Sequence, residues 1–180
     1  KTVQSAYLFT GPSGTGKTTS ARIFANMIND GKGNPIEVDA ASNSGVDNIR
    51  QIIEDAKRKP LDAEYKIFIV DECHSLSDSS WQALLKTLEE PPKFTIFIFC
   101  TTNPEKIPAT ILSRVQRYNF QKISNEGIVD RLNMILEKES DEIDNLSCKL
   151  NWEQDALEFI AKVSSGGMRD AITLLDKCIS

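Results

Sequence analysis

The chain has 180 residues, which is enough for one large domain or for a domain and a smaller second one. A hydrophobic fraction of 40% and a charged fraction of 26% are ordinary for a globular protein, and no apolar run is long enough to cross a membrane. The formal net charge of −5 excludes a general basic field for nucleic acid, so a DNA partner would need a local patch or an assembly.

The cysteine pattern argues against a metal site. Cys73, Cys100, Cys148 and Cys178 lie far apart and form no C-x-x-C pair. We therefore expect no zinc site and a reduced, intracellular protein. No signal peptide is recognisable, and the sequence begins at Lys1 rather than Met, so we expect it to be a fragment of a longer protein.

The first predicted elements flank a glycine-rich loop. The apolar residues 7–10 are typical of a strand, and residues 18–29 have the pattern of a helix. Between them, residues 11–18 fit G-x-x-x-x-G-K-[ST], the phosphate-binding P-loop. A strand, a glycine turn and a helix N-terminus gather backbone N–H groups and the positive helix end at one place, which suits an anion. An ordinary glycine-rich turn is the alternative, and the complete motif with its flanks disfavours it.

The P-loop residues have distinct expected roles. Glycines let the backbone wrap closely around phosphates, because no Cβ stands in the way. Lys17 is expected to reach the β- and γ-phosphates, and the Thr18 hydroxyl is expected to bind Mg²⁺. The predicted nucleotide-binding residues are Gly11, Pro12, Ser13, Gly14, Thr15, Gly16, Lys17, Thr18 and Thr19.

Strands and helices then alternate along the chain to about residue 120. Consecutive apolar residues indicate strands buried on both faces, as in a parallel sheet, and apolar residues at helical spacing indicate the helices between them. We expect strands at 36–39, 66–70, 96–100 and 117–120, and helices over 46–56, 81–88 and 109–113. Candidate N-caps are Ser42, Asn43 or Ser44 for the first of these helices and Asp78 for the second.

From about Ser124 the pattern changes to amphipathic helices alone. Three apolar stripes follow, with a break at 166–167 before the last: Ile128, Leu132, Ile135 and Leu136; Leu157, Ile160 and Val163; and Ala171, Leu174, Leu175 and Cys178. The predicted fold class is therefore α/β. A parallel P-loop sheet flanked by helices occupies residues 1–121, and a small helical lid domain occupies residues 122–180.

Polar residues end two of the predicted buried strands. Asp71 and Glu72 follow one strand, at the carboxyl end where open α/β sheets place ligands. Asp71 suits a carboxylate near Mg²⁺, and Glu72 suits a base that polarises an attacking water. Two solvated acids are the alternative, which a P-loop at this distance disfavours. Thr102, after the next strand, suits a hydrogen bond to the γ-phosphate or the water, and turn formation before Pro104 is an equally good interpretation.

Two arginines are further candidates. An inserted arginine stabilises the charge that phosphoryl transfer leaves on equatorial oxygens. Arg114 follows a short helix, where a surface salt bridge is the alternative, and Arg169 starts the last helix, where Asp170 is able to compensate its charge. His74, the single histidine, is expected to pack or hydrogen-bond rather than catalyse, and Cys73 to be a small buried residue.

Taken together, these residues resemble the AAA+ ATPases. The P-loop, Asp71-Glu72, Thr102, Arg114 and Arg169 stand in the order of Walker A, Walker B, sensor 1, arginine finger and sensor 2. Five stretches further resemble the gamma/tau-type clamp-loader ATPases of bacterial DNA polymerase III, and these are 39–43, 71–77, 83–92, 107–114 and 167–171.

The resemblance implies ATP and Mg²⁺ as cofactors and ATP hydrolysis while a sliding clamp is loaded onto primed DNA. It implies that Arg114 acts on ATP bound to a neighbouring subunit, and that Arg169 reaches the γ-phosphate of its own subunit from the lid. The helix that begins near Ser44 would touch the DNA backbone without reading its sequence. The implied partners are other clamp-loader subunits, the sliding clamp and primed DNA, with no membrane, in the cytoplasm of a bacterial or phage-infected cell.

Three departures from the family pattern matter. The family's four-cysteine zinc module is replaced by the loop 30–35, the finger reads Ser113-Arg114-Val115 with Val for Cys, and the adenine-wrapping and collar segments are not in the sequence. We therefore expect no bound zinc and a monomer in isolation. Two alternatives remain, namely a non-hydrolysing structural subunit of the delta-prime type and another AAA+ DNA motor such as a branch-migration helicase subunit.

Overall fold

The computed structural model describes residues 3–143 and 151–179. Its contacts divide the chain into two compact units. The first unit comprises the residues up to Gly11 together with Lys17–Phe120, and the second comprises Pro12–Gly16 together with the residues from Gln121 onward. No helix in the described ranges is both long and apolar enough to cross a membrane.

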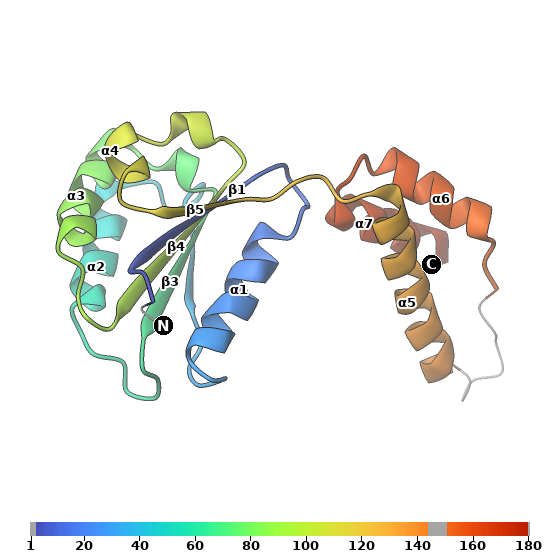
Figure 1. Ribbon diagram of the computed structural model, residues 1–180, viewed down its shortest axis with the longest axis horizontal. Coiled ribbons are helices and arrows are strands. Elements are labelled where there is room, and N and C mark those ends of the chain that lie inside the picture. Colours follow the sequence, from blue (N-terminus) through green and yellow to red (C-terminus); the bar gives the residue numbers. More distant parts are fainter. Residues whose placement is uncertain (1–2, 144–150, 180) are drawn as a thin grey trace. The chain divides into compact units, whose positions relative to one another are not determined.

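The first unit is organised around a five-stranded sheet in the order β2-β3-β4-β1-β5 (Figure 1). Each neighbouring pair of strands is parallel, which confirms the predicted α/β fold. The strands are Ala6–Thr10 (β1), Ile36–Asp39 (β2), Lys66–Asp71 (β3), Thr95–Thr101 (β4) and Gln116–Asn119 (β5).

Helices cover both faces of this sheet, with α1 on one face and α2 and α3 on the other (Figure 1). This arrangement explains why the central strands are apolar throughout, because neither of their faces meets water. The helical segments of the unit are Lys17–Ile28 (α1), Val46–Ala56 (α2), Cys73–Ser75 (η1), Asp78–Glu89 (α3), Pro104–Lys106 (η2) and Ala109–Leu112 (α4).

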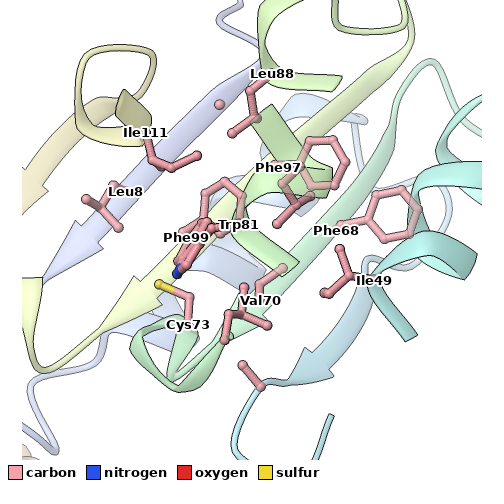
Figure 2. Close-up of a cluster of buried hydrophobic side chains, with 14 of the residues drawn as sticks. Leu8, Ile49, Phe68, Val70, Cys73, Trp81, Leu88, Phe97, Phe99 and Ile111 are labelled. Carbon is pink, nitrogen blue, oxygen red and sulfur yellow. The ribbon is translucent and has the colours of Figure 1, made fainter. Parts of the chain in front are cut away.

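Alternate residues of each central strand enter two different cores. Phe97 and Phe99 of β4 point to the side of α2 and α3, where Trp81 packs among them (Figure 2). Ile96 and Ile98, their neighbours along the strand, pack instead against α1. This period of two fixes the register of the sheet, since a slip by one residue would exchange the two cores.

Two predicted helix caps are wrong. The N-cap of α2 is Gly45 and has no side-chain hydrogen bond, because the side chains of Ser42 and Asn43 bond to Asp39 instead. The N-cap of α3 is Ser77, whose hydroxyl accepts the backbone N–H of Ser80. The remaining N-cap candidates therefore fail as well, since Ser44 precedes the cap of α2 and Asp78 lies within the first turn of α3.

The described part of the second unit contains the helices Asn125–Ile143 (α5), Gln154–Val163 (α6) and Met168–Ile179 (α7). They share a core of their own, to which Leu132, Leu157 and Leu175 contribute buried side chains. Two predicted members of the apolar stripes are wrong, because Val163 and Cys178 are exposed. Cys148 lies outside the described residues.

Candidate functional site

The carboxyl ends of the central strands meet at one edge of the sheet. Thr10, at the end of β1, pairs in register with Thr101 of β4 and with Asn119 of β5. Connections run in opposite directions from β1 and β4, and this reversal point is where open α/β sheets bind ligands. The residues that follow β1, β3 and β4 are therefore the candidates for a site.

The loop after β1 has a backbone that suits only glycine at three positions. Gly11, Gly14 and Gly16 have φ angles of +145°, +72° and +90°. A Cβ at Gly11 would lie 2.3 Å from the carbonyl oxygen of Phe120, whereas a Cβ at Gly16 would meet nothing within 4 Å. Gly11 thus allows the backbone to pack closely against Phe120. Gly16 leaves the space beside its Cα empty, so that a ligand is able to approach the loop backbone there.

Backbone N–H groups of this loop are available to an anion. Those of Ser13, Gly14 and Gly16 donate to no acceptor in the ranges 3–143 and 151–179. Lys17 begins α1 directly after the loop, and only 6% of its surface is exposed. Its Nζ donates to the carbonyl oxygen of Gly11 at 2.8 Å. Free amides followed directly in the sequence by a buried lysine at a helix start are the groups that bind a phosphate chain.

Thr18 and Asp71 form the oxygen-rich part of the site. The Thr18 hydroxyl donates to Asp71 Oδ2 at 2.7 Å, which joins the start of α1 to the end of β3. Asp71 also accepts the backbone N–H of Glu72 through Oδ1. A hydroxyl and a carboxylate are hard oxygen ligands, so this pair fits Mg²⁺ in the chemistry of its donors.

Glu72 has a strained backbone and a side chain that contacts two neighbours. Its φ of 44° and ψ of 43° lie in the left-handed region, which a residue other than glycine rarely occupies. Oε2 lies 3.1 Å from the Thr102 hydroxyl, whose one proton is shared with Asn103 Oδ1 at 2.9 Å, and it lies 3.3 Å from His74 Nδ1. The predicted pair Glu72 and Thr102 is thus in direct contact, and the hydrogen bond of His74 to the Thr101 hydroxyl matches its expected role.

Thr101 is a member of this cluster that sequence reasoning missed. It is fully buried at the end of β4, and its hydroxyl lies 3.1 Å from His74 Nδ1 and accepts the backbone N–H of Asn103. A polar residue that ends an otherwise apolar strand was the available signal. Thr101 therefore fixes both the ring of His74 and the turn that carries Thr102.

Arg114 lies away from this cluster along the fold, after α4. Its guanidinium forms an ion pair with Glu89 at 2.7 Å and also donates to Thr110 and Ser113. The predicted alternative for Arg114, a surface ion pair, is thus present in the isolated chain. Sequence reasoning missed Glu89, because no local pattern links it to a residue 25 positions later.

Within the second unit, the turn of Pro12–Gly16 contacts the start of α7. The backbone N–H of Met168 donates to the carbonyl oxygen of Gly14 at 2.9 Å. A Cβ at Gly14 would lie 3.2 Å from Gly167 Cα and 3.5 Å from Arg169 Cβ. Arg169 is exposed, and its guanidinium has no hydrogen bond or ion pair to the described part of the chain.

The cysteines near the site are not nucleophiles. Cys73 is fully buried, and burial raises the pKa of its thiol well above the usual value. Burial and the nearby Asp71 carboxylate raise the pKa of Cys100 to about 12. Among the described residues, no group of three His, Cys, Asp or Glu side chains is arranged to hold a metal ion.

Known proteins share both the sequence and the fold. The family model described as DNA polymerase III, delta subunit, matches residues 34–124, half of the chain. The model described as DNA polymerase III clamp loader subunit, ATPase lid domain, matches residues 127–180. The chain belongs to the DNA polymerase III clamp-loader family. This confirms the family that the sequence motifs indicated.

Curated relatives of this clamp-loader chain are gamma/tau subunits. It is 46% identical to DNA polymerase III subunit tau of Bacillus subtilis over 97% of the chain, and 34% identical to subunit tau of Escherichia coli over 99%. It is 41% identical to subunit gamma/tau of Mycoplasma genitalium over 95% of the chain. The chain spans 33%, 30% and 31% of these three relatives, that is, about a third of their length.

Solved structures show the same fold at lower identity. The Thermotoga maritima RuvB Holliday junction branch migration motor matches with a TM-score of 0.69 and 21% identity, over 96% of this chain and 53% of that one. A point variant of the same RuvB motor matches with a TM-score of 0.70 and 22% identity, with the same coverage of both chains. This likeness supports the AAA+ fold, a P-loop sheet followed by a helical lid, as the sequence predicted.

Proposed function

We propose that this chain binds ATP with Mg²⁺ and hydrolyses it as a motor subunit of a cytoplasmic DNA polymerase III clamp loader. Membership of the family supports this proposal. The observation that carries it is the site itself. A buried Lys17 follows a loop with free backbone N–H groups, and Thr18 contacts Asp71 at 2.7 Å.

Each residue of the site has a proposed role. The loop amides and Lys17 bind the phosphates, with Thr19 beside them at the helix start. Thr18 and Asp71 would hold Mg²⁺, which supplies charge neutralisation at the phosphate oxygens when bound. Glu72 orients the attacking water and accepts its proton.

Thr102 and His74, which lie 3.1 and 3.3 Å from Glu72 Oε2, would orient its carboxylate. A base held in one orientation accelerates hydrolysis more than a mobile one, because a misoriented attacking water raises the activation barrier. Arg114 is proposed to act on ATP bound to a neighbouring subunit, and Arg169 on the γ-phosphate of its own subunit. The partners of the assembly would be other clamp-loader subunits, the sliding clamp and primed DNA.

A calorimetric titration with ATPγS and Mg²⁺ tests the binding step. We expect binding by the wild-type chain, no measurable binding by Lys17→Ala, and unchanged binding by Lys32→Ala, a matched exposed lysine. Glu72→Gln should bind as the wild type does and lose at least about a hundredfold in hydrolysis, as removal of a general base does. Equal binding by Lys17→Ala and the wild type would contradict the proposal.

A structural, non-hydrolysing clamp-loader subunit is the second candidate. One observation favours it, namely that the matching family model is the one described for a delta subunit. That match begins at residue 34 and so leaves the P-loop outside it. Hydrolysis by the full-length protein in its assembly decides between the two, because only the motor should lose activity when Glu72 becomes Gln.

A further inference from the structure

Arg114 is held by three acceptors in the first unit. Nη2 lies 2.7 Å from Glu89 Oε1, and Nη1 donates to the carbonyl oxygen of Thr110 and, at 3.2 Å, to the hydroxyl of Ser113. Two of the acceptors come from the turn that carries Arg114 itself. Glu89 alone comes from another element, and it supplies the only charge of the three.

A rigid element places the carboxylate of Glu89. It is the last residue of α3, whose Leu84 and Leu88 are buried in the core of the sheet. The helix ends directly afterwards at Glu90, since Pro91 and Pro92 are unable to continue it. The position of Glu89 is therefore set by the core rather than by a mobile loop.

These contacts leave two N–H donors of the Arg114 guanidinium available. They account for three bonds, all from Nη1 and Nη2. A guanidinium has five N–H donors, so Nε–H and a second Nη2–H remain without an acceptor in the described part of the chain. Both donors lie in the plane of a guanidinium, a group that binds phosphate oxygens well.

We propose that Glu89 is a positioning residue for Arg114, which fixes the guanidinium so that its remaining donors face a phosphate of the neighbouring subunit. This inference rests on the proposed role of Arg114 in the assembly. Because the two side chains are 32% and 50% exposed, the pair contributes little to folding. Loss of Glu89 should therefore change the orientation of Arg114 and leave the fold intact.

The contact itself is tested in the chain described here. Arg114 is modified with phenylglyoxal, and the rate is followed by mass spectrometry of the peptide that contains it. Glu89→Ala should raise this rate several-fold, because the guanidinium loses its fixed partner. Glu90→Ala is the matched control and should leave the rate unchanged. An unchanged rate in Glu89→Ala would overturn the proposal.

The role is tested in the full-length subunit assembled with its clamp-loader partners, the clamp and primed DNA. Glu89→Ala should lower kcat for ATP hydrolysis about tenfold while KM for ATP stays the same, as expected for lost orientation. Glu89→Gln should lie between Glu89→Ala and the wild type, because its carbonyl oxygen still accepts a hydrogen bond. Glu90→Ala should match the wild type, and all variants should unfold at the same urea concentration.

Arg114→Ala separates the two levels of the proposal. ATP hydrolysis by Arg114→Ala at the wild-type rate would contradict the proposed role of Arg114, and with it the proposed role of Glu89. Lost hydrolysis in Arg114→Ala beside wild-type hydrolysis in Glu89→Ala would overturn only the positioning role. Faster hydrolysis in Glu89→Ala would also overturn it, since Glu89 would then restrain Arg114 rather than orient it.

Discussion

At Gly11 the backbone leaves no room for a side chain, which gives a direct test of the loop geometry. Gly11→Ala combines a φ of +145° with a Cβ 2.3 Å from the carbonyl oxygen of Phe120. We expect a loss of about 3 kcal/mol in the free energy of unfolding, measured in urea, because the chain must move to relieve the clash.

Gly16→Ala is the control for Gly11→Ala. Its φ is also positive, at +90°, but its Cβ would meet nothing within 4 Å. It should therefore lower the free energy of unfolding only through the strained backbone conformation, by about 1 kcal/mol. Equal losses in the two variants would show that the close approach of Phe120 is not what requires glycine at Gly11.

The thiols give a second prediction at this scale. Because burial raises the pKa of Cys73 and raises that of Cys100 to about 12, both stay protonated at pH 8. A neutral thiol is a poor nucleophile, and a buried one is also inaccessible. Iodoacetamide at pH 8 should therefore modify the exposed Cys178 and spare Cys73 and Cys100 until urea unfolds the chain, as peptide mass spectrometry would show. Rapid modification of Cys100 in the native protein would contradict this.

Single residues were predictable where a local motif carries them. The spacing from Gly11 to Thr18 identified the loop, and the acids after an apolar run identified Asp71. Thr101 and Glu89 were not predictable, because their partners lie 27 and 25 residues away and meet them only in the folded chain. The roles of the site residues remain proposals.

Among the elements, the start of α3 offers a test between two neighbouring residues. Ser77→Ala removes the hydroxyl that accepts the N–H of Ser80 at 3.2 Å, so it should cost about 1 kcal/mol of unfolding free energy. Asp78→Ala removes only a charge near the helix N-terminus and should cost a few tenths of a kcal/mol, about 0.3. A loss in Asp78→Ala larger than that in Ser77→Ala, measured by urea unfolding, would restore Asp78 as the cap.

Strands and helices followed from the sequence better than their ends did. The run before Asp71 and the stripe from Trp81 to Leu88 each form the predicted element, since their apolar pattern is what the sheet buries. The cap of α2 failed for a physical reason. Ser42 and Asn43 are good capping residues, but their side chains bond to Asp39 and so stabilise the preceding turn instead.

For the whole molecule, the separate cores predict separate responses to mutation. Leu132 is fully buried in the core of the second unit, and Ile98 in that of the first. Each change to alanine should cost about 3 kcal/mol in its own unit, through lost burial and the cavity left behind. Hydrogen exchange should show lost protection in α5, α6 and α7 for Leu132→Ala, and in β3 and β4 for Ile98→Ala.

Loss of protection in both units from either change would show that the two units unfold as one cooperative structure.

We propose residues 1–121 and 122–180 as the two domains, the division that the change of sequence pattern indicated. The backbone hydrogen bond from Met168 to Gly14 was not predicted, because the loop motif describes only its own residues and the resemblance concerned only the Arg169 side chain.

The membership of Pro12–Gly16 in the second unit limits how such proteins are recombined. Consider a chimera that exchanges helical lids between relatives through a single junction after Phe120. Its Met168 would come from one parent and the Gly14 turn that accepts the Met168 N–H would come from the other. A graft that also carries residues 12–16 would keep that native pairing. The chain therefore has three natural splice points, at Gly11, Gly16 and Phe120, although its sequence patterns suggest only one.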